Sequence, residues 1–510
     1  MLGGVSWPWT RVPTGRAVLL VVAAGLFVGV PVAPAAALPG AKISATKLEP
    51  VASYPGIQHL HYKTAPIPIE PGQNSILFKP TDLKPQVPGY ITRFRPNLVY
   101  TGSGKVPRVD VIHLHHGVWL INGIPTLAAG EEKTSVNLPQ GYGFHSDPSD
   151  SWNLNYMIHN LTADPSSVRL TYDIDFVPDS APAAKGITPV HPLWMDVSGV
   201  RVYPVFDARR GEGKHGKFTF PDQARGRQKA DIGFAHSWKV PSDMTLIGTA
   251  GHLHPGGLHN DLDVRRAGHT KLLFRSKAKY FEPAGAVSWD VSMTATKPSW
   301  RIALRRGDVL STNVTYDTSK ASWYESMGIM VVWYADGKRP GAVDPFSGHY
   351  DHTGLLTHGH LPENDNHGGD PFPLPDARTL GNGFQTSDVS IKDFTYGRGD
   401  LNGTGNAARP PVVKAGNSIT FTNLDATQST PYPQEAYHTI TACKAPCNRS
   451  TGIAYPIANG KGGFDSKELG YGTPGAGVDH WSTPKNLSPG TYTYFCRIHP
   501  FMRGAFRVVK

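Results

Sequence analysis

Glycine and proline recur along the whole chain and leave little room for long helices. The sequence has 55 glycines and 45 prolines among its 510 residues, and both residue types disfavour the interior of a helix. Between them lie short runs rich in Val, Thr and Tyr, which favour strands. We therefore predict an all-β protein, with enough residues for several domains.

The order of strand-like and turn-rich segments predicts three β domains. The first covers about 50–195 and the second about 196–336. Residues 337–384 are rich in Gly, Pro, Asp and His and have little periodicity, which is typical of a linker or a long ordered loop. A third β domain is expected over 385–510.

The first 37 residues have the pattern of a signal peptide. Arg11 and Arg16 form a basic flank, residues 17–30 are mostly apolar, and alanines at 35–37 offer a cleavage site. There is no paired arginine, so we expect export by the general secretory (Sec) route to the cell envelope or the medium. The alternative is an uncleaved anchor, although the apolar run is short for a membrane span. No later stretch is long enough to cross a membrane.

The net charge is +10, but the basic residues are scattered. They form no run interleaved with aromatic side chains, so we expect no nucleic-acid partner. Positive charge of this kind suits docking to an acidic redox protein or to an anionic cell surface.

All three cysteines lie in the last 70 residues of the chain. Cys443 and Cys447 are four residues apart and can form a local disulfide in an oxidising compartment. This leaves Cys496 without a disulfide partner. A lone thiol in an exported protein calls for an explanation, and metal ligation is one.

The segment around Cys496 carries a full set of soft and borderline metal ligands. His499 and Met502 follow Cys496 at intervals of three residues, and His438 lies on a strand-like run upstream. One thiolate, two imidazoles and a weak axial thioether are the ligands of a type 1 (blue) copper site. A tight loop between strands can deliver three of these ligands together. The alternative is a buried structural cysteine with incidental neighbours.

The Cys-x2-His-Pro-Phe-Met loop resembles that of the cupredoxins, above all the amicyanin and plastocyanin type. The resemblance covers roughly the last 110 residues and implies a Greek-key β-sandwich with one type 1 copper near one end. Asn423, in Phe-Thr-Asn-Leu-Asp, matches the cupredoxin asparagine that ties the two ligand loops together. The resemblance implies a supporting role for it beside the copper.

A second group of histidines lies upstream. His252 and His254 are two residues apart, so on a strand they face the same side and can chelate one metal, and the same holds for His113 and His115. The adjacent His115 and His116 can share a metal only at a strand end or a bulge, which the following glycine would permit. The further candidates are His159 and Met327. The alternatives are unrelated histidines or a structural zinc.

The order and spacing of these residues resemble the copper type II, ascorbate-dependent monooxygenases, such as peptidylglycine α-hydroxylating monooxygenase and dopamine β-monooxygenase. The likeness spans about 60–335 and implies two jelly-roll-like β-sandwich domains, each with one mononuclear copper. By position the first copper would take His115, His116 and His159, with His113 as an extra candidate. The second copper, at which O2 would be activated, would take His252, His254 and Met327.

The chain also departs from that family. Both upstream domains have no cysteine, whereas the family is rich in disulfides, and the residues that clamp a peptide carboxylate are replaced by Ala250, Ile329 and Val331. A peptidylglycine substrate is therefore not expected, and the small-molecule substrate stays unknown.

Two functions remain open on this basis. One is an exported, O2-dependent, monooxygenase-like copper oxidoreductase, supplied with electrons by a redox partner protein or a small reductant. The other is a non-enzymatic electron carrier or copper-binding protein. A multicopper oxidase is disfavoured because no histidine adjoins Cys496.

Overall fold

The computed structural model describes most of the chain after residue 51. The predicted signal peptide, 1–37, lies outside the described residues. The described ranges are 52–70, 76–109, 111–131, 136–162, 164–198, 205–225, 236–281, 289–319, 323–361, 374–430, 435–443, 445–447, 463–472, 477–499 and 501–510.

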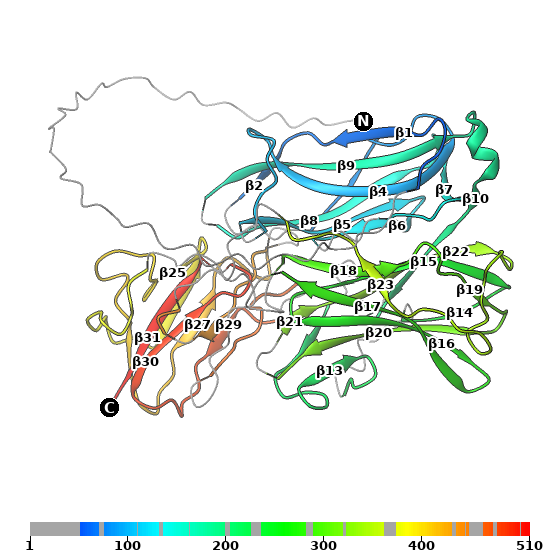
Figure 1. Cartoon of the computed structure of the whole chain (residues 1–510). Helices are drawn as coiled ribbons and strands as arrows, with labels where there is room; N and C mark the ends of the chain where they lie inside the picture. Colours follow the sequence, from blue (N-terminus) through cyan, green and yellow to red (C-terminus); the bar gives the residue numbers. More distant parts are fainter. Residues whose placement is uncertain are drawn as a thin grey trace, which may run out of the picture. The chain divides into compact units, whose positions relative to one another are not determined.

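The predicted all-β class is confirmed. Over the described ranges the secondary structure consists of strands and a single short 3-10 helix, η1 (Pro182–Gly186). No described helix is long and apolar enough to span a membrane. The boundaries predicted for the three β domains stay predictions, but the strands do group into sheets along the chain (Figure 1).

Two sheets form from the first part of the chain. Along β9 the side chains of every second residue, from Val168 to Phe176, are buried, and they pack with Phe94 and Trp119 in one core. The first sheet has the order β1 (Gln58–Lys63), β9 (Ser166–Pro178), β4 (Gly89–Tyr100), β7 (Tyr142–Ser146) and β10 (Thr188–Pro189), with β2 (Ile67–Ile69) beside β9. The second has the order β3 (Ile76–Pro80), β8 (Trp152–Asn160), β5 (Ile112–Ile121) and β6 (Ile124–Ala129).

The middle of the chain forms a larger sheet. Ile247, Val331 and Trp333 from this sheet are buried in the same core as the first two sheets. The order is β11 (His191–Asp196), β22 (Gly328–Asp336), β15 (Met244–Leu253), β18 (Val291–Thr296), β17 (His269–Tyr280), β16 (Gly257–Arg266), β20 (Val309–Asp317) and β13 (Lys217–Phe220). Further strands pair at its sides: β14 (Ser237–Lys239) with β20, β19 (Ile302–Leu304) with β15, and β23 (Gly354–Leu356) with β18. A separate pair joins β12 (Phe206–Ala208) to β21 (Trp323–Ser326).

Strand β23 lies within 337–384, the segment that was predicted to be a linker or a long ordered loop. It pairs with β18 and so adds to the large sheet.

The last part of the chain forms two four-stranded sheets with a core of their own. Buried side chains of both sheets, among them Phe421, Tyr494 and Phe506, pack between them. One sheet has the order β25 (Thr395–Tyr396), β24 (Asp388–Lys392), β27 (Thr420–Asn423) and β29 (His480–Ser482). The other has the order β26 (Val412–Lys414), β31 (Arg503–Val509), β30 (Gly490–Phe495) and β28 (Thr441–Cys443).

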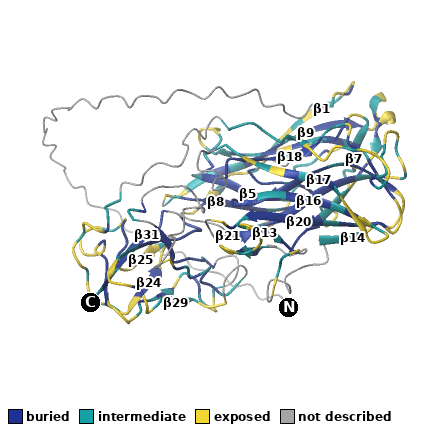
Figure 2. Ribbon diagram, turned by 60° about the horizontal axis from the view of Figure 1, so that its bottom comes forward, coloured by how far each residue is buried: buried dark blue, intermediate teal, exposed yellow. Residues whose placement is uncertain are grey.

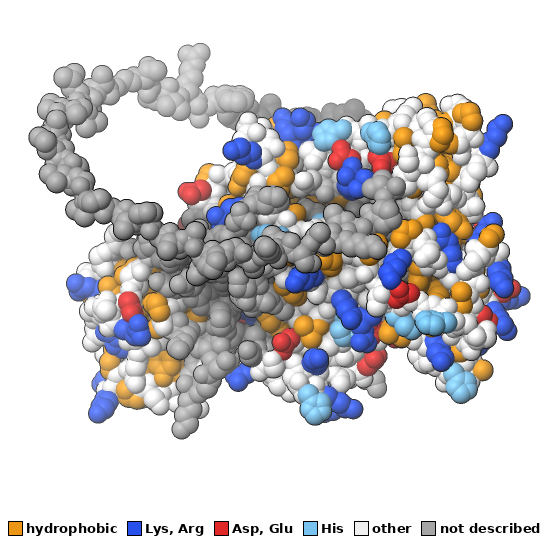
Figure 3. Space-filling model, viewed as in Figure 1, with side chains coloured by type: hydrophobic (Ala, Val, Ile, Leu, Met, Phe, Trp, Pro, Cys, Tyr) orange, Lys and Arg blue, Asp and Glu red, His pale blue; other side chains and the backbone are white. Residues whose placement is uncertain are grey.

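Burial follows the strands, while exposed residues concentrate in the connections (Figure 2). On the face seen in Figure 3, Lys and Arg side chains are spread among neutral and acidic ones and do not gather into one stripe. This distribution matches the scattered basic residues of the sequence.

Candidate metal centres

The C-terminal site forms where two paired strands end side by side. Thr441 at the start of β28 pairs with Phe495 at the end of β30. His438, three residues before β28, and Cys496, directly after β30, therefore meet at the same end of the sheet. The tight connection from β30 to β31 then brings in His499 and Met502, and Met502 accepts a hydrogen bond at its carbonyl from the Cys496 amide (3.1 Å).

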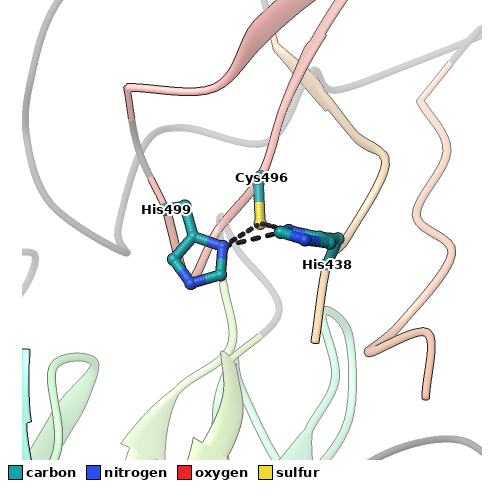
Figure 4. A group of neighbouring side chains, drawn as sticks. All are labelled: His438, Cys496 and His499. Atoms are coloured by element: carbon teal, nitrogen blue, oxygen red, sulfur yellow. Dashed lines mark hydrogen bonds between the residues drawn. The ribbon is translucent and has the colours of Figure 1, made fainter. Parts of the chain in front are cut away.

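Three ligand atoms converge at this point (Figure 4). The distances are 3.6 Å from Cys496 Sγ to His499 Nδ1, 3.9 Å from Cys496 Sγ to His438 Nδ1, and 3.0 Å between the two Nδ1 atoms. A metal ion held at about 2.0 Å by nitrogen and about 2.3 Å by sulfur needs its ligand atoms about 3 to 4 Å apart. All three side chains are buried. In the described part of the chain no other group of three His, Cys, Asp or Glu side chains has its ligand atoms this close together.

Asp425 fixes the orientation of His438. The His438 Nε2–H donates to Asp425 Oδ2 (2.9 Å), so Nδ1 is left with a lone pair that faces Cys496 and His499. The same carboxylate accepts the backbone amides of Asp393 (2.7 Å) and Phe394 (3.1 Å). Burial tends to raise the pKa of Asp425, but the bond to His438 and the two amides bring it down to about 2. A carboxylate behind a ligating imidazole is a common device for orienting a metal ligand.

Thr439 links the strand of His438 to the loop of Cys496. Its backbone amide points at Cys496 Sγ (3.3 Å), and its Oγ1 accepts the amide of Arg497 (2.9 Å). Burial alone raises the pKa of the Cys496 thiol, yet the imidazoles of His499 and His438 outweigh it and hold this pKa well below the ordinary range. The site therefore favours a thiolate, which is the form that ligates metals.

Asn423 does not make the tie that the resemblance implies. Its Nδ2 donates to the carbonyls of Ala436 and Leu469, both at 2.8 Å, and its Oδ1 accepts the Asp425 amide (3.0 Å). These bonds hold the segment that leads to His438, and none reaches the loop of Cys496. Thr439 provides that link instead, so Asn423 supports one side of the site only.

His499 and Met502 are both buried. His499 is only 1% exposed, and the ring of Phe394 lies edge-on to the rings of both His499 (4.9 Å) and His438 (5.4 Å). Met502 belongs to the core cluster that also contains Cys496 and Tyr494. No ligand histidine of this site is therefore presented to solvent.

The cysteines follow the predicted division. Cys443 and Cys447 form a disulfide, and Cys496 is a free, buried thiol.

Upstream, a β-bulge places the first group of histidines. His113 pairs directly with His159 across β5 and β8, and the register then shifts between Leu114 and His116. The shift falls at His115, which is where a bulge is needed for neighbouring histidines to turn toward each other. The Nδ1 atoms of His115 and His116 lie 3.3 Å apart.

A second group forms where β15 ends beside the start of β22. Leu253 pairs with Gly328, so His252 and His254 on one strand lie next to Met327 at the same sheet edge. The Tyr316 hydroxyl joins them, because it accepts the amides of His254 (3.1 Å) and Met327 (3.0 Å) and donates to the Met327 carbonyl (2.8 Å). The His254 Nδ1 faces the Glu325 carbonyl, so its Nε2 is the atom left for a metal.

The two upstream groups are in direct contact. The rings of His115 and His254 have centroids 4.4 Å apart, and His115 lies 4.6 Å from His159. The indole of Trp289 contacts His113 (4.5 Å), His115 (4.9 Å) and His254 (5.3 Å). The histidine rings and the Trp289 indole that meet here are buried.

The trio of His115, His116 and His159, which was expected to hold the first copper, is not preformed in the structure. Their ligand nitrogens do not all lie within 4.8 Å of one another, although the three residues are described and buried. His115 Nδ1 lies 3.3 Å from His116 Nδ1, and the ring of His115 also contacts that of His159 at 4.6 Å, while His159 is paired with His113 across the two strands. The structure thus offers pairs of imidazoles and not a preformed three-histidine site.

The upstream imidazoles are poor proton acceptors. Burial lowers the pKa of His115, His159 and His254 well below 6.5, and the surrounding histidines lower it further, with His499 among those that act on His159. Among the described residues, neither ring nitrogen of His159 has a hydrogen-bond partner, and the same is true of His254 Nε2. Buried polar atoms of this kind are expensive to leave unsatisfied, and neutral imidazole is the form that binds metals.

A small cavity of about 40 Å³ lies beside the strand of His252. Ala250, Ile247 and Val331 line it, together with Trp333 and the side of Lys297. Ala250 and Val331 are two of the positions at which the sequence resemblance implies a substrate carboxylate clamp, and their side chains are apolar. Lys297 is engaged with Asp351.

Several supporting residues were not predicted from the sequence. Asp425 follows Asn423 by two residues and Thr439 directly follows His438, so proximity in sequence was a usable signal for these two. Tyr316 lies on β20 and Trp289 in the segment before β18, and both reach the histidines only through the tertiary fold, for which the sequence gives no local sign.

Comparison with known proteins gives no family assignment. No model of a protein family matches the chain, and no curated protein matches it. Solved structures that match in part include a purple cupredoxin from Nitrosopumilus maritimus (18% identity, 24% of this chain and 100% of that chain, TM-score 0.16). The Cu(I) form of a single-residue mutant of amicyanin matches at 20% identity (28% and 100%, TM-score 0.15). A copper-containing nitrite reductase from Thermus scotoductus matches at 12% identity (53% and 59%, TM-score 0.17). With such low scores, the function rests on the geometry of the sites.

Proposed function

We propose that this protein is an exported copper oxidoreductase in which a type 1 copper site exchanges electrons with copper held by the upstream histidines, where O2 is used. The observation that carries the proposal is the convergence of Cys496, His438 and His499 at ligand distances in a buried pocket. Copper, when bound, would supply one-electron redox chemistry at the C-terminal site and O2 activation upstream.

The residues of the C-terminal site fit a type 1 copper by the chemistry of their donors. Cys496 would supply a thiolate, His438 and His499 would each supply Nδ1, and Met502, on the same loop as Cys496, would supply a thioether. Asp425 and Thr439 hold His438 and Cys496 in place without ligating. A buried, preorganised set of this kind changes little between redox states, which favours fast electron transfer.

The burial of His499 favours an electron route inside the protein. A carrier that meets soluble partners needs an exposed edge at its metal site, whereas His499 is 1% exposed. Its imidazole is also one of the groups that act electrostatically on His159. The electron route proposed between the C-terminal site and the upstream cluster runs between these two histidines.

For the upstream cluster we propose O2-dependent chemistry of the monooxygenase type, which the sequence resemblance implies. His252 and His254 hold the metal, Met327 adds a thioether, and Tyr316 keeps His254 and Met327 together. The cavity at Ala250 and Val331, about 40 Å³ in volume, lies beside the strand of His252 and is the place we assign to a small substrate. The alternative, a non-enzymatic carrier, requires only the C-terminal site.

Copper content and spectroscopy separate these functions. The copper-loaded protein should bind about three coppers per chain and show an intense thiolate-to-copper absorption. Met327→Ile should abolish O2 consumption in the presence of a reductant and leave the blue colour intact. One copper per chain with no O2 consumption would favour the simple carrier, and a colourless copper-loaded protein would refute the type 1 site.

A further inference from the structure

The six upstream histidines come from two separate parts of the chain, yet they form one continuous cluster. His113, His115, His116 and His159 lie on β5 and β8, while His252 and His254 lie at the end of β15. His115 is the centre of the cluster, because its ring contacts those of His159 (4.6 Å) and His254 (4.4 Å). His252 extends it beyond His254, at 5.3 Å.

We propose that this cluster is a single dinuclear copper centre shared by the two upstream β regions, with the two ions close enough to be magnetically coupled. The inference rests on the proposed function and replaces the two separate mononuclear sites that the sequence resemblance implies. It assigns the histidine pairs of both regions to one buried centre.

The pairing of nitrogens favours two ions over one. His115 Nδ1 and His116 Nδ1 lie 3.3 Å apart, which fits two nitrogens that share an ion at about 2.0 Å. No three of the six histidines have ligand nitrogens within 4.8 Å of one another. The cluster therefore offers the His115–His116 pair for one ion, and we assign the second ion to His252 and His254, whose rings lie 5.3 Å apart. It lacks the geometry for one ion held by three imidazoles.

Two independent observations indicate that a ligand is required. His159 is 2% exposed and both of its ring nitrogens lack a hydrogen-bond partner among the described residues, and His254 Nε2 lacks one as well. These two residues belong to the two different β regions. Trp289 packs against His113, His115 and His254 at once, so an apolar ring closes the cluster on one side. Metal ions would satisfy these buried nitrogens in the form of imidazole that burial favours.

A shared centre ties the two regions together. Removal of a histidine from either region should disturb both ions, because each ion neighbours ligands of the other. In two independent sites, a change in one region would leave the copper of the other untouched. This difference can be measured without reference to catalytic activity.

The test uses the full mature chain, loaded with copper and oxidised, with copper quantified and electron paramagnetic resonance (EPR) spins counted on the same sample. We expect about three coppers per chain but an EPR spin count close to that of the type 1 copper alone, because the other two are coupled. Two uncoupled type 2 signals that bring the spin count up to the copper content would overturn the proposal. So would a chain that binds copper only at the type 1 site.

Variants make the test specific. His115→Ala and His254→Ala, one from each region, should each lower the copper content and abolish the coupling, while the blue absorption in the same sample reports that the chain is folded. His269→Ala replaces an exposed histidine of β17 and should change nothing. If His254→Ala leaves one full upstream copper with an unaltered signal, the sites are independent and the proposal fails. Loss of the blue signal in wild type would instead refute the type 1 site.

Discussion

The two metal centres are built in different ways. The C-terminal site takes Cys496, His499 and Met502 from one tight loop and His438 from the strand beside it. The upstream cluster draws its ligands from three strands of two sheets that meet around a shared core. A local site can be recognised from spacing, whereas a site assembled from distant strands depends on how the sheets meet.

The largest expected effect concerns the thiolate. Cys496→Ser should abolish the thiolate-to-copper absorption completely, because only sulfur gives that covalent transition. The upstream cluster shares no ligand with this site, so its copper should remain, as measured by copper analysis and EPR. Loss of all copper in this variant would show that the two centres do not bind copper independently. Cys447→Ser, which removes the disulfide instead, serves as the control that keeps the blue colour.

Acid should affect the metal-free upstream cluster more than the C-terminal site. Burial lowers the pKa of His115, His159 and His254 below their ordinary 6.5, so only the unfolded chain takes up protons on them just below that pH. The stability that these three histidines contribute is fully present above pH 6.5 and is lost as the pH drops toward their pKa values in the folded chain. The slope is at most about 1.4 kcal/mol per pH unit for each histidine.

The contribution of the C-terminal site to stability depends on pH with the opposite sign. The pKa of His438 is raised: burial opposes this, but Asp425 and the Cys496 thiolate outweigh it. Its contribution is present below pH 6.5 and is lost as the pH rises. The three upstream histidines outnumber His438, so the free energy of unfolding of the metal-free chain in urea should fall between pH 7.5 and 5.0. The dependence of this free energy on pH should be shallower in His159→Gln and unchanged in His269→Gln. A pH-independent free energy of unfolding would contradict the assignment.

Replacing Asp425 should weaken the C-terminal site selectively. Asp425→Asn removes the charge that orients His438 and should lower copper affinity there by about 10- to 100-fold, the usual cost of losing such a partner. Competition with a chelator, followed by the blue absorption, measures this. Asp376→Asn, at a partly exposed carboxylate paired with Arg378, is the matched control, and equal affinities for both variants would show that Asp425 has no such role.

The smallest expected effect concerns Thr439. Thr439→Val keeps the shape of this buried side chain but removes the oxygen that accepts the Arg497 amide. An unsatisfied buried amide costs about 1 to 3 kcal/mol, so the unfolding midpoint should fall and the blue absorption should shift slightly. The upstream copper signals should not move. Thr395→Val, at an exposed position, provides the reference.

The sequence was sufficient for the class of fold and for the local site. Alternating strands and turns predicted an all-β chain, and the spacing of Cys496, His499 and Met502 predicted ligands on one loop. It also indicated a bulge near His115. The merging of the histidine groups could not be predicted, because ring contacts such as His115 to His254 depend on how the sheets pack. The resemblance to the monooxygenases implied one mononuclear site in each domain instead.

The central claim is that the C-terminal site and the upstream cluster exchange electrons within one chain. The direct measurement is stopped-flow absorption of the fully reduced, copper-loaded protein mixed with O2. We predict rapid return of the blue absorption in wild type and a return slowed by at least about tenfold in His159→Ala and Met327→Ile, with His269→Ala like wild type. Return of the blue colour at the wild-type rate in both upstream variants would contradict the account.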